Sequence, residues 1–121
     1  MLTRFLGKVK VDDIPPSVNH YWAAKGNRRF ITKRGKEFKK LLSTHASFFK
    51  KRKTNGDVYL EIEVCLPDRR RRDVDNFLKP ILDSLEGIVY EDDSQVRGLY
   101  IAKIFKRNQK YTVVRVFECL R

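Results

Sequence analysis

One short stretch of the chain combines the two kinds of side chain that metal-assisted chemistry on a phosphate ester requires. Four consecutive arginines at positions 69–72 run directly into Asp73 and Asp75, and Lys79 follows four positions after Asp75. Arginine and lysine hold phosphate groups, whereas clustered carboxylates hold Mg²⁺. Together these residue types point to metal-assisted chemistry on a nucleic acid backbone.

The spacing of the aspartates favours a cation between them. Side chains two positions apart on an extended chain project from the same side, so Asp73 and Asp75 repel each other unless a cation lies between them. Mg²⁺ prefers oxygen ligands and keeps waters that can become nucleophiles. Asp92 or Asp93, in a second acidic segment, could add a third carboxylate for phosphodiester hydrolysis. Lys79 could then offset the charge that develops on the phosphate.

The same residues also have structural interpretations. Asp75 can simply cap a helix, and Asp73 can pair with Arg72. Asp92 and Asp93 can form a polar turn, and an arginine run is often a solvated or phosphate-binding face without chemistry. Spacing alone therefore leaves both an enzyme and a non-catalytic binding module open.

The arginine–aspartate stretch lies between two predicted elements. Apolar residues alternate with Tyr, Glu and Cys over residues 58–66, which predicts a strand with one face on the core, ended by Pro67. Asp75 or Asn76 then begins a helix that runs to about Glu86. The core side of this helix is predicted to consist of Phe77 or Leu78, Ile81, Leu82 and Leu85.

The remaining pattern predicts an α+β fold. A first strand is expected over residues 5–11, an amphipathic helix over about 34–51, and two final strands over 96–106 and 110–120. His45 lies on the apolar stripe of that helix, so it is expected to be packed or half-buried and not a metal ligand. The result is one small mixed β-sheet packed with two main helices, in a single domain spanning residues 1–121.

Between the first strand and the first helix, aromatic and basic residues lie close together on a predicted loop. Tyr21 and Trp22 precede Lys25, Arg28 and Arg29. This composition suits base stacking with phosphate contact. Packing at the edge of the core explains the two aromatic residues equally well.

The net charge and the isoelectric point of the chain agree with a polyanionic partner. The 121 residues carry a formal net charge of +12, with a pI near 10.0. An anionic membrane surface would be the competing partner, but no run approaches the roughly 20 apolar residues of a membrane span, and the first residues lack a signal-peptide pattern. A cytoplasmic protein is expected. Cys65 and Cys119 lie in apolar runs and are interpreted as ordinary buried thiols.

Two segments of the sequence resemble one known family. The segment Pro-Asp-Arg-Arg-Arg-Arg-Asp-Val-Asp-Asn-x-x-Lys at 67–79, with Asp83, Leu85 and the acidic run at 91–96, resembles the RusA family of Holliday junction resolvases. The Pro-Pro-Ser-Val-Asn-His-Tyr sequence at 15–21 is similar to that family's opening motif. The resemblance covers essentially the whole chain, although residues 25–56 match only in kind.

The resemblance implies a homodimeric, magnesium-dependent endonuclease that cuts four-way DNA junctions by paired symmetric incisions in recombination and repair. The family's essential aspartates correspond to Asp73, Asp75 and Asp93, and its functional lysine to Lys79. In the family, the second aspartate of the acidic pair is the catalytic one, so the resemblance makes Asp92 the weaker candidate. The loop before the pair is about one residue shorter than in the family. Family members are often carried by phages or prophages.

The resulting hypothesis places Mg²⁺ on the three aspartates, with phosphates of branched DNA held by basic residues. A two-fold dimer would match the two equivalent strands of a junction, and no membrane or small-molecule cofactor is expected. The alternatives are a non-catalytic basic nucleic-acid-binding module, or a nuclease that acts on flaps or forks. The expected DNA-binding residues are Arg69, Arg70, Arg71, Arg72, Lys25, Arg28 and Arg29.

Overall fold

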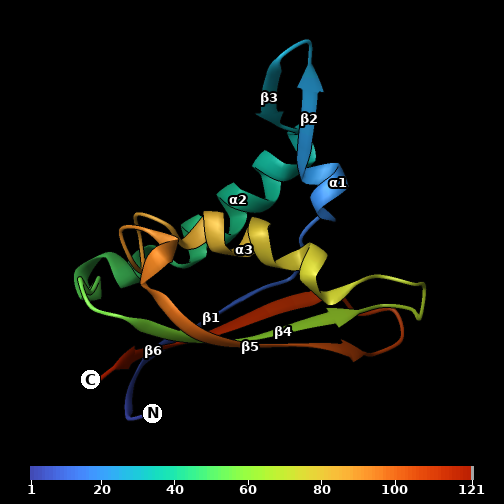
Figure 1. Ribbon diagram of the computed structural model, residues 1–121. Helices are drawn as coiled ribbons and strands as arrows, with labels where there is room; N and C mark the ends of the chain where they lie inside the picture. Colours follow the sequence, from blue (N-terminus) through green and yellow to red (C-terminus); the bar gives the residue numbers. More distant parts are fainter. Residues whose placement is uncertain (121) are drawn as a thin grey trace.

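The fold is built on a mixed four-stranded β-sheet whose helices all lie on one face (Figure 1). The structure is a computed structural model, and it describes residues 1–120, except for the side chains of Val18 and Asn19. The strand order is β1-β6-β4-β5. The strands span Thr3–Val11 (β1), Val58–Leu66 (β4), Val96–Phe105 (β5) and Tyr111–Cys119 (β6).

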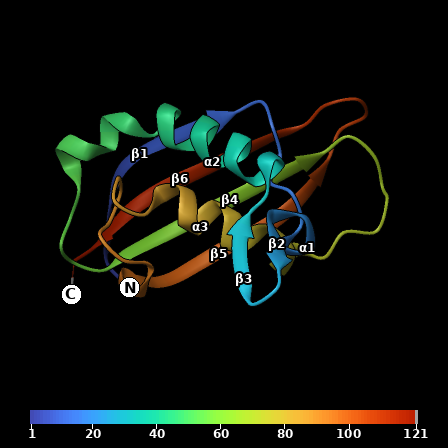
Figure 2. The ribbon, with the colours of Figure 1, turned by 90° about the horizontal axis from the view of Figure 1, so that it is seen from above.

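Helices α2 (Lys33–His45) and α3 (Leu78–Leu85) lie across the same face of the sheet, as Figure 2 shows from above. The Ser43 hydroxyl donates to the Ser84 carbonyl at 2.8 Å, which ties the two helices together. The core forms between the helices and the sheet because each element turns its apolar side inward. Its fully buried members include Phe38, Leu42, Leu60, Ile62, Val64, Ile81 and Leu85.

Strands β4 and β5 pair in parallel, whereas every other pairing in this sheet is antiparallel. A parallel pair requires a crossover connection, here residues 67–95 with α3 across the sheet. That crossover contains the whole arginine–aspartate stretch and the second acidic segment. It includes two short 3-10 helices, η2 (Val74–Phe77) and η3 (Asp93–Gln95).

A separate two-stranded hairpin projects away from the body of the protein (Figure 1). It consists of β2 (Trp22–Lys25) and β3 (Arg28–Ile31), and it follows the short helix α1 (Val18–Tyr21). Gly26, at φ 63°, begins the two-residue turn between the strands, a conformation that glycine adopts without steric cost. The prediction of a loop in this region was therefore wrong.

The predicted α+β class, with a mixed sheet and two main helices, is confirmed. Strand β4 has the predicted bounds, and the predicted inward stripe is buried at Phe77, directly before α3, and at Ile81 and Leu85 within it. Cys65 is buried and Cys119 half-buried, and both thiols are free. No helix in the part of the chain that the structure describes is long and apolar enough to cross a membrane.

Two local predictions were wrong. The helix expected to reach residue 51 ends at His45, and the chain continues after Ala46 as the 3-10 helix η1 (Ser47–Arg52). His45, the last residue of α2, is exposed, and Phe48 is exposed as well because the break shifts the helical phase. The second helix has no side-chain cap from Asp75, since η2 precedes it and Phe77 occupies the N-cap position.

Candidate active site

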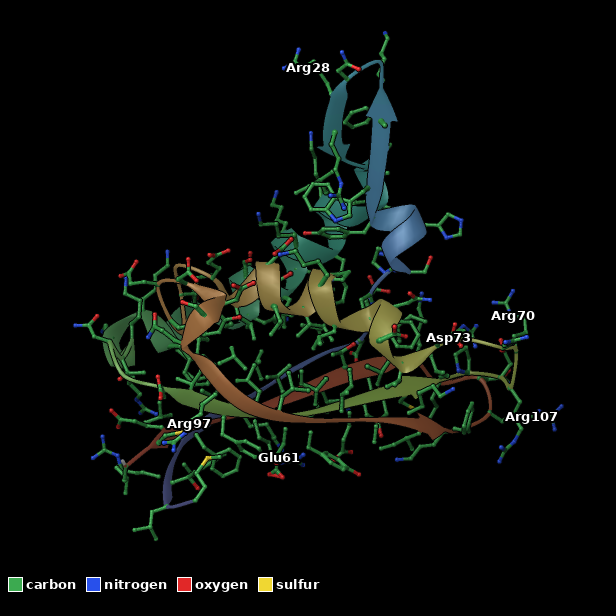
Figure 3. All side chains as sticks on the ribbon, in the orientation of Figure 1. Arg28, Glu61, Arg70, Asp73, Arg97 and Arg107 are labelled. Carbon is green, nitrogen blue, oxygen red and sulfur yellow. The ribbon has the colours of Figure 1, made fainter. Side chains whose placement is uncertain are left out.

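An open cleft of about 570 Å³ is lined by Asp73 and by three of the four arginines, Arg70, Arg71 and Arg72. One wall comes from the loop that follows β4, and the opposite wall comes from the segment that follows β1. Two stretches of sequence more than 50 positions apart thus meet at one surface. In Figure 3, Asp73 and Arg70 lie at the same end of the sheet. The lining residues are Ile14, Pro15, Pro16, Ser17, His20, Arg34, Arg70, Arg71, Arg72, Asp73, Asn76 and Phe77.

Asp68 organises the arginine loop. Its carboxylate accepts hydrogen bonds from the Arg70 backbone amide at 2.9 Å and from Arg72 Nη1 at 2.8 Å. These bonds, led by the one from Arg72, lower the pKa of Asp68 to about 2. Lys103 on β5 donates to the Arg72 carbonyl at 2.7 Å, which ties the loop to the sheet. The suggested pairing of Arg72 with Asp73 was wrong, because Arg72 pairs with Asp68.

The other three arginines are exposed and differ in their contacts. The Arg69 guanidinium lies over the Phe105 ring, 4.6 Å from its centroid. Arg70 contacts Asp68 at 3.4 Å through Nε, a long and solvated ion pair. Arg71 lines the cleft beside Arg70. The run therefore presents cations along the cleft, and it suits contacts with an extended polyanion.

The opposite wall of the cleft is fixed by an ion pair that sequence reasoning missed. Both terminal nitrogens of Arg34 donate to the Asp13 carboxylate at 2.8 Å, and Nη2 also donates to the Ile14 carbonyl at 2.9 Å. This bidentate contact holds the segment after β1 against α2. His20, which was given no role, also lines the cleft, and its Nδ1 lies 2.9 Å from the Ser17 hydroxyl. No spacing in the sequence indicated the Arg34–Asp13 ion pair or the position of His20.

Lys79 joins α3 to the second acidic segment. Its ammonium lies 3.0 Å from Asp83 Oδ1 and 3.6 Å from Asp93 Oδ2. The hydrogen bond with Asp83 is the main cause of the raised pKa of Lys79, and Asp93 adds to it. Asp83 has a side chain that is only 12% exposed, against 49% for Lys79. Asp83 is thus a nearly buried anchor, and its position one helical turn after Lys79 could have indicated this pairing.

Two buried tyrosines surround this group. Burial, followed by the negative charge of Asp83, raises the pKa of Tyr21 to about 12. Burial also raises the pKa of Tyr90, with Asp93 as the next cause. Both phenols therefore stay protonated, and the Tyr90 hydroxyl donates to the Leu82 carbonyl at 2.8 Å.

The acidic loop is held by Gln95. Its Oε1 accepts from the backbone amides of Glu91 and Asp92 at 2.8 and 3.1 Å. Its Nε2 donates to the carbonyls of Thr54 and Gly56 at 2.9 and 2.8 Å. Two of these four bonds lie within the acidic loop, and the other two fasten the loop to the turn before β4.

The two aspartates of this loop have different roles. Asp92 caps η3, because its carboxylate accepts from the Ser94 amide at 2.8 Å, and that bond lowers the pKa of Asp92. Asp93 lies beside Lys79 instead. Of the two, Asp93 is therefore the one whose carboxylate does not serve as a helix cap.

One chain does not gather the three predicted aspartates into one group. Among residues 1–120, apart from the side chain of Asn19, no three His, Cys, Asp or Glu side chains lie close enough to hold a metal ion. Asp73 and Asp75 precede α3 and are exposed, whereas Asp93 follows α3 and is placed beside Lys79. Exposed carboxylates are still the donors that Mg²⁺ prefers.

The remaining predicted DNA-binding residues lie on the hairpin, away from the cleft. Figure 3 shows Arg28 at its far end. The Arg29 guanidinium lies over the Trp22 ring, 4.4 Å from its centroid. Tyr21 is fully buried and contacts Trp22 edge-on, with 5.3 Å between the ring centroids. Packing is therefore the correct interpretation for Tyr21.

These features define a class of small, basic α+β domains with an arginine-lined cleft and aspartates on one crossover. The family model described as "Endodeoxyribonuclease RusA" matches residues 13–116, and the chain therefore belongs to the RusA family of endodeoxyribonucleases. A protein named crossover junction endodeoxyribonuclease rusA, from Enterobacteria phage HK97, is 36% identical over 95 residues, covering 74% of this chain and 76% of its own length. A protein of that name from Aquifex aeolicus (strain VF5) is 25% identical over 114 residues, covering 93% and 87%.

Proposed function

We propose that this protein resolves four-way (Holliday) DNA junctions by paired symmetric incisions, in DNA recombination and repair. The observation that carries the proposal is the cleft in which the Pro15–Ser17 segment faces the arginine run and Asp73. Both family motifs thus contribute to one basic surface in a member of an endodeoxyribonuclease family. The two relatives carry names that specify crossover junctions, and one comes from a phage.

We assign Asp73, Asp75 and Asp93 as the residues that would hold one or two Mg²⁺ ions. A magnesium ion needs only one or two protein carboxylates when substrate phosphate and waters complete its octahedron, so one chain does not have to supply a closed cage. When bound, Mg²⁺ would supply Lewis acidity at the scissile phosphate. Lys79 would offset negative charge on the phosphate, and Asp83 keeps its ammonium near Asp93.

The basic residues would hold the substrate by its backbone. Exposed cations along the cleft can contact flanking phosphates without reading sequence, and a net charge of +12 attracts the polyanion. We also propose a homodimer, because a two-fold assembly presents two sites to the two equivalent strands of a junction. The activity requires no small-molecule cofactor or membrane, and it would take place in the cytoplasm. The residues assigned to DNA contact are Arg69, Arg70, Arg71, Arg72, Lys25, Arg28 and Arg29.

The decisive test is cleavage by aspartate variants. Asp75→Asn should abolish cutting of a labelled four-way junction and leave binding intact or tighter, because it removes carboxylate–phosphate repulsion. Asp73→Asn and Asp93→Asn should behave in the same way. Asp57→Asn is the matched control, since this exposed aspartate precedes β4 at the end opposite the arginine loop. Cutting by Asp75→Asn at the wild-type rate would overturn the assignment.

Substrate and metal controls separate the alternatives. Junction, flap, fork and duplex DNA are each incubated with Mg²⁺ or with a chelator. Symmetric, magnesium-dependent cutting of the junction supports the proposal, whereas preference for flaps or forks indicates a different nuclease. Binding without cutting on any substrate indicates a non-catalytic module.

A further inference from the structure

The β2–β3 hairpin is a positively charged projection, and the segment of sequence around it contains no acidic residue. Residues 14–36 contain six lysines and arginines but no aspartate or glutamate. Lys25 and Arg28 lie at its end, and Figure 3 shows Arg28 at this tip, away from the sheet. The cleft residues lie on the body of the protein instead. The hairpin is thus a second basic surface, separate from the arginine loop.

The pairing of the strands places like charges directly opposite each other. Lys25 pairs with Arg28, and Ala23 with Phe30, so all four side chains lie on one face of the ribbon. Like charges directly opposite on neighbouring strands are destabilising. All three cations of the hairpin are exposed, and within the described part of the chain none of them forms an ion pair with an acidic residue. A polyanion would relieve this repulsion.

The same face carries an apolar group in contact with solvent. Phe30 is 46% exposed, although it lies one residue from the half-buried Ile31 at the base of the hairpin. On the opposite face, the Trp22 ring is covered, since the Arg29 guanidinium stacks on it. One face of the ribbon therefore offers cations at its end and an exposed ring nearer its base.

The base of the hairpin is rigidly attached, so the projection has a fixed direction. The Thr32 amide donates to the Tyr21 carbonyl at 2.9 Å, and Tyr21 is fully buried. Gly35 brings α2 so close that an added Cβ would lie 2.8 Å from Ile31 and 2.9 Å from the Tyr21 carbonyl. An isolated two-stranded ribbon is marginally stable, and these contacts compensate for that.

We propose that the β2–β3 hairpin enters the major groove of a duplex arm of the DNA substrate, away from the cut. The proposal rests on the proposed function, because it takes branched DNA as the ligand. The major groove of B-DNA is wide enough for a two-stranded ribbon. Lys25 and Arg28 reach the phosphates that border the groove, and Phe30 contacts base edges such as the methyl group of thymine. Sequence preference at this contact is weak.

The test compares Lys25→Ala/Arg28→Ala with Lys50→Ala/Lys51→Ala. The control removes the same charge from exposed lysines of η1, at the other end of α2. Dissociation constants for a four-way junction are measured from about 50 to about 200 mM salt. Loss of two phosphate contacts lowers the slope of log affinity against log salt by about 1.8, so over this range the wild type loses about 12-fold more affinity than the hairpin variant. The control follows the wild type.

Methylation of guanine N7 by dimethyl sulfate locates the contact. The wild type should protect guanines within one arm of the junction, and Phe30→Ala or the double variant should lose that protection. Unchanged melting temperatures show that the variants are folded. The proposal would be overturned if the hairpin double variant had the same salt slope as the control, or if the wild type did not protect guanine N7. In the first case, an acidic protein becomes the better partner for the hairpin. Junction cutting without protection of an arm refutes the hairpin contact and leaves the proposed function intact. Protection of an arm without cutting supports the hairpin contact and refutes the proposed function.

Discussion

Replacing Gln95 by glutamate tests how the acidic loop is held, because the change preserves shape, removes the two donor hydrogens and adds a negative charge. In the wild type, Nε2 donates to the carbonyls of Thr54 and Gly56 at 2.9 and 2.8 Å. In the variant, a carboxylate oxygen would face those two carbonyl oxygens. Each lost bond costs about 0.5–1.5 kcal/mol, so the free energy of unfolding should fall by about 1–3 kcal/mol, with repulsion adding to the loss.

Urea unfolding of the wild type and of Gln95→Glu measures this difference, with Gln109→Glu as control. Gln109 is exposed in the turn between β5 and β6, so the same chemical change there should leave stability within about 0.5 kcal/mol of wild type. Junction cutting by Gln95→Glu should also slow, because Asp93 lies in the loop that Gln95 fastens. A Gln95→Glu protein as stable as the control would refute the role of Gln95 as the clamp of this loop.

Two further predictions concern ion pairs of the crossover. Asp83→Ala should slow junction cutting about tenfold because it releases Lys79, and it should have no further effect on a Lys79→Ala background. A double-mutant cycle of cleavage rates measures this coupling. Additive effects of the two substitutions would indicate that Asp83 acts only on the fold. The pKa of Asp68 is lowered, so its ion pairing is present above its ordinary pKa of 3.8 and is lost as the pH falls towards about 2. An NMR titration of the carboxyl carbon should show this midpoint, and Arg72→Ala should move it upward; a midpoint that Arg72→Ala leaves in place would contradict the pairing.

The main elements could be predicted because hydrophobic periodicity determines which face is buried. The alternation over residues 58–66 gave the bounds of β4, and the apolar stripe of α3 gave its buried side. The hairpin could not be predicted in this way, since Trp22 to Lys25 contains no alternation and the strands are held mainly by their base. The end of α2 was missed because Phe48 and Phe49 continue the apolar spacing through the break after His45.

The candidate site was predictable in its residue types and not in its contacts. The motif placed Arg69–Arg72 and Asp73 on one loop, and the structure supplies the facing wall through Arg34 and Asp13. That ion pair joins residues 21 positions apart, and no local pattern reports it. Likewise, the position of Asp93 depends on the path of the crossover after α3. One chain places it beside Lys79 without completing a three-carboxylate group.

The parallel pairing of β4 with β5 has a consequence for how fast this protein folds. β5 can add to the sheet only after residues 67–95 have crossed it, so the pairing must wait for closure of a long connection. All three assigned aspartates, Lys79 and the four consecutive arginines lie within that connection. The segment that would perform the chemistry is thus also the segment whose ordering limits assembly of the sheet edge. Substitutions that loosen α3 or the loop around Gln95 would lengthen the time during which the β4 edge is unpaired, when the chain is open to aggregation.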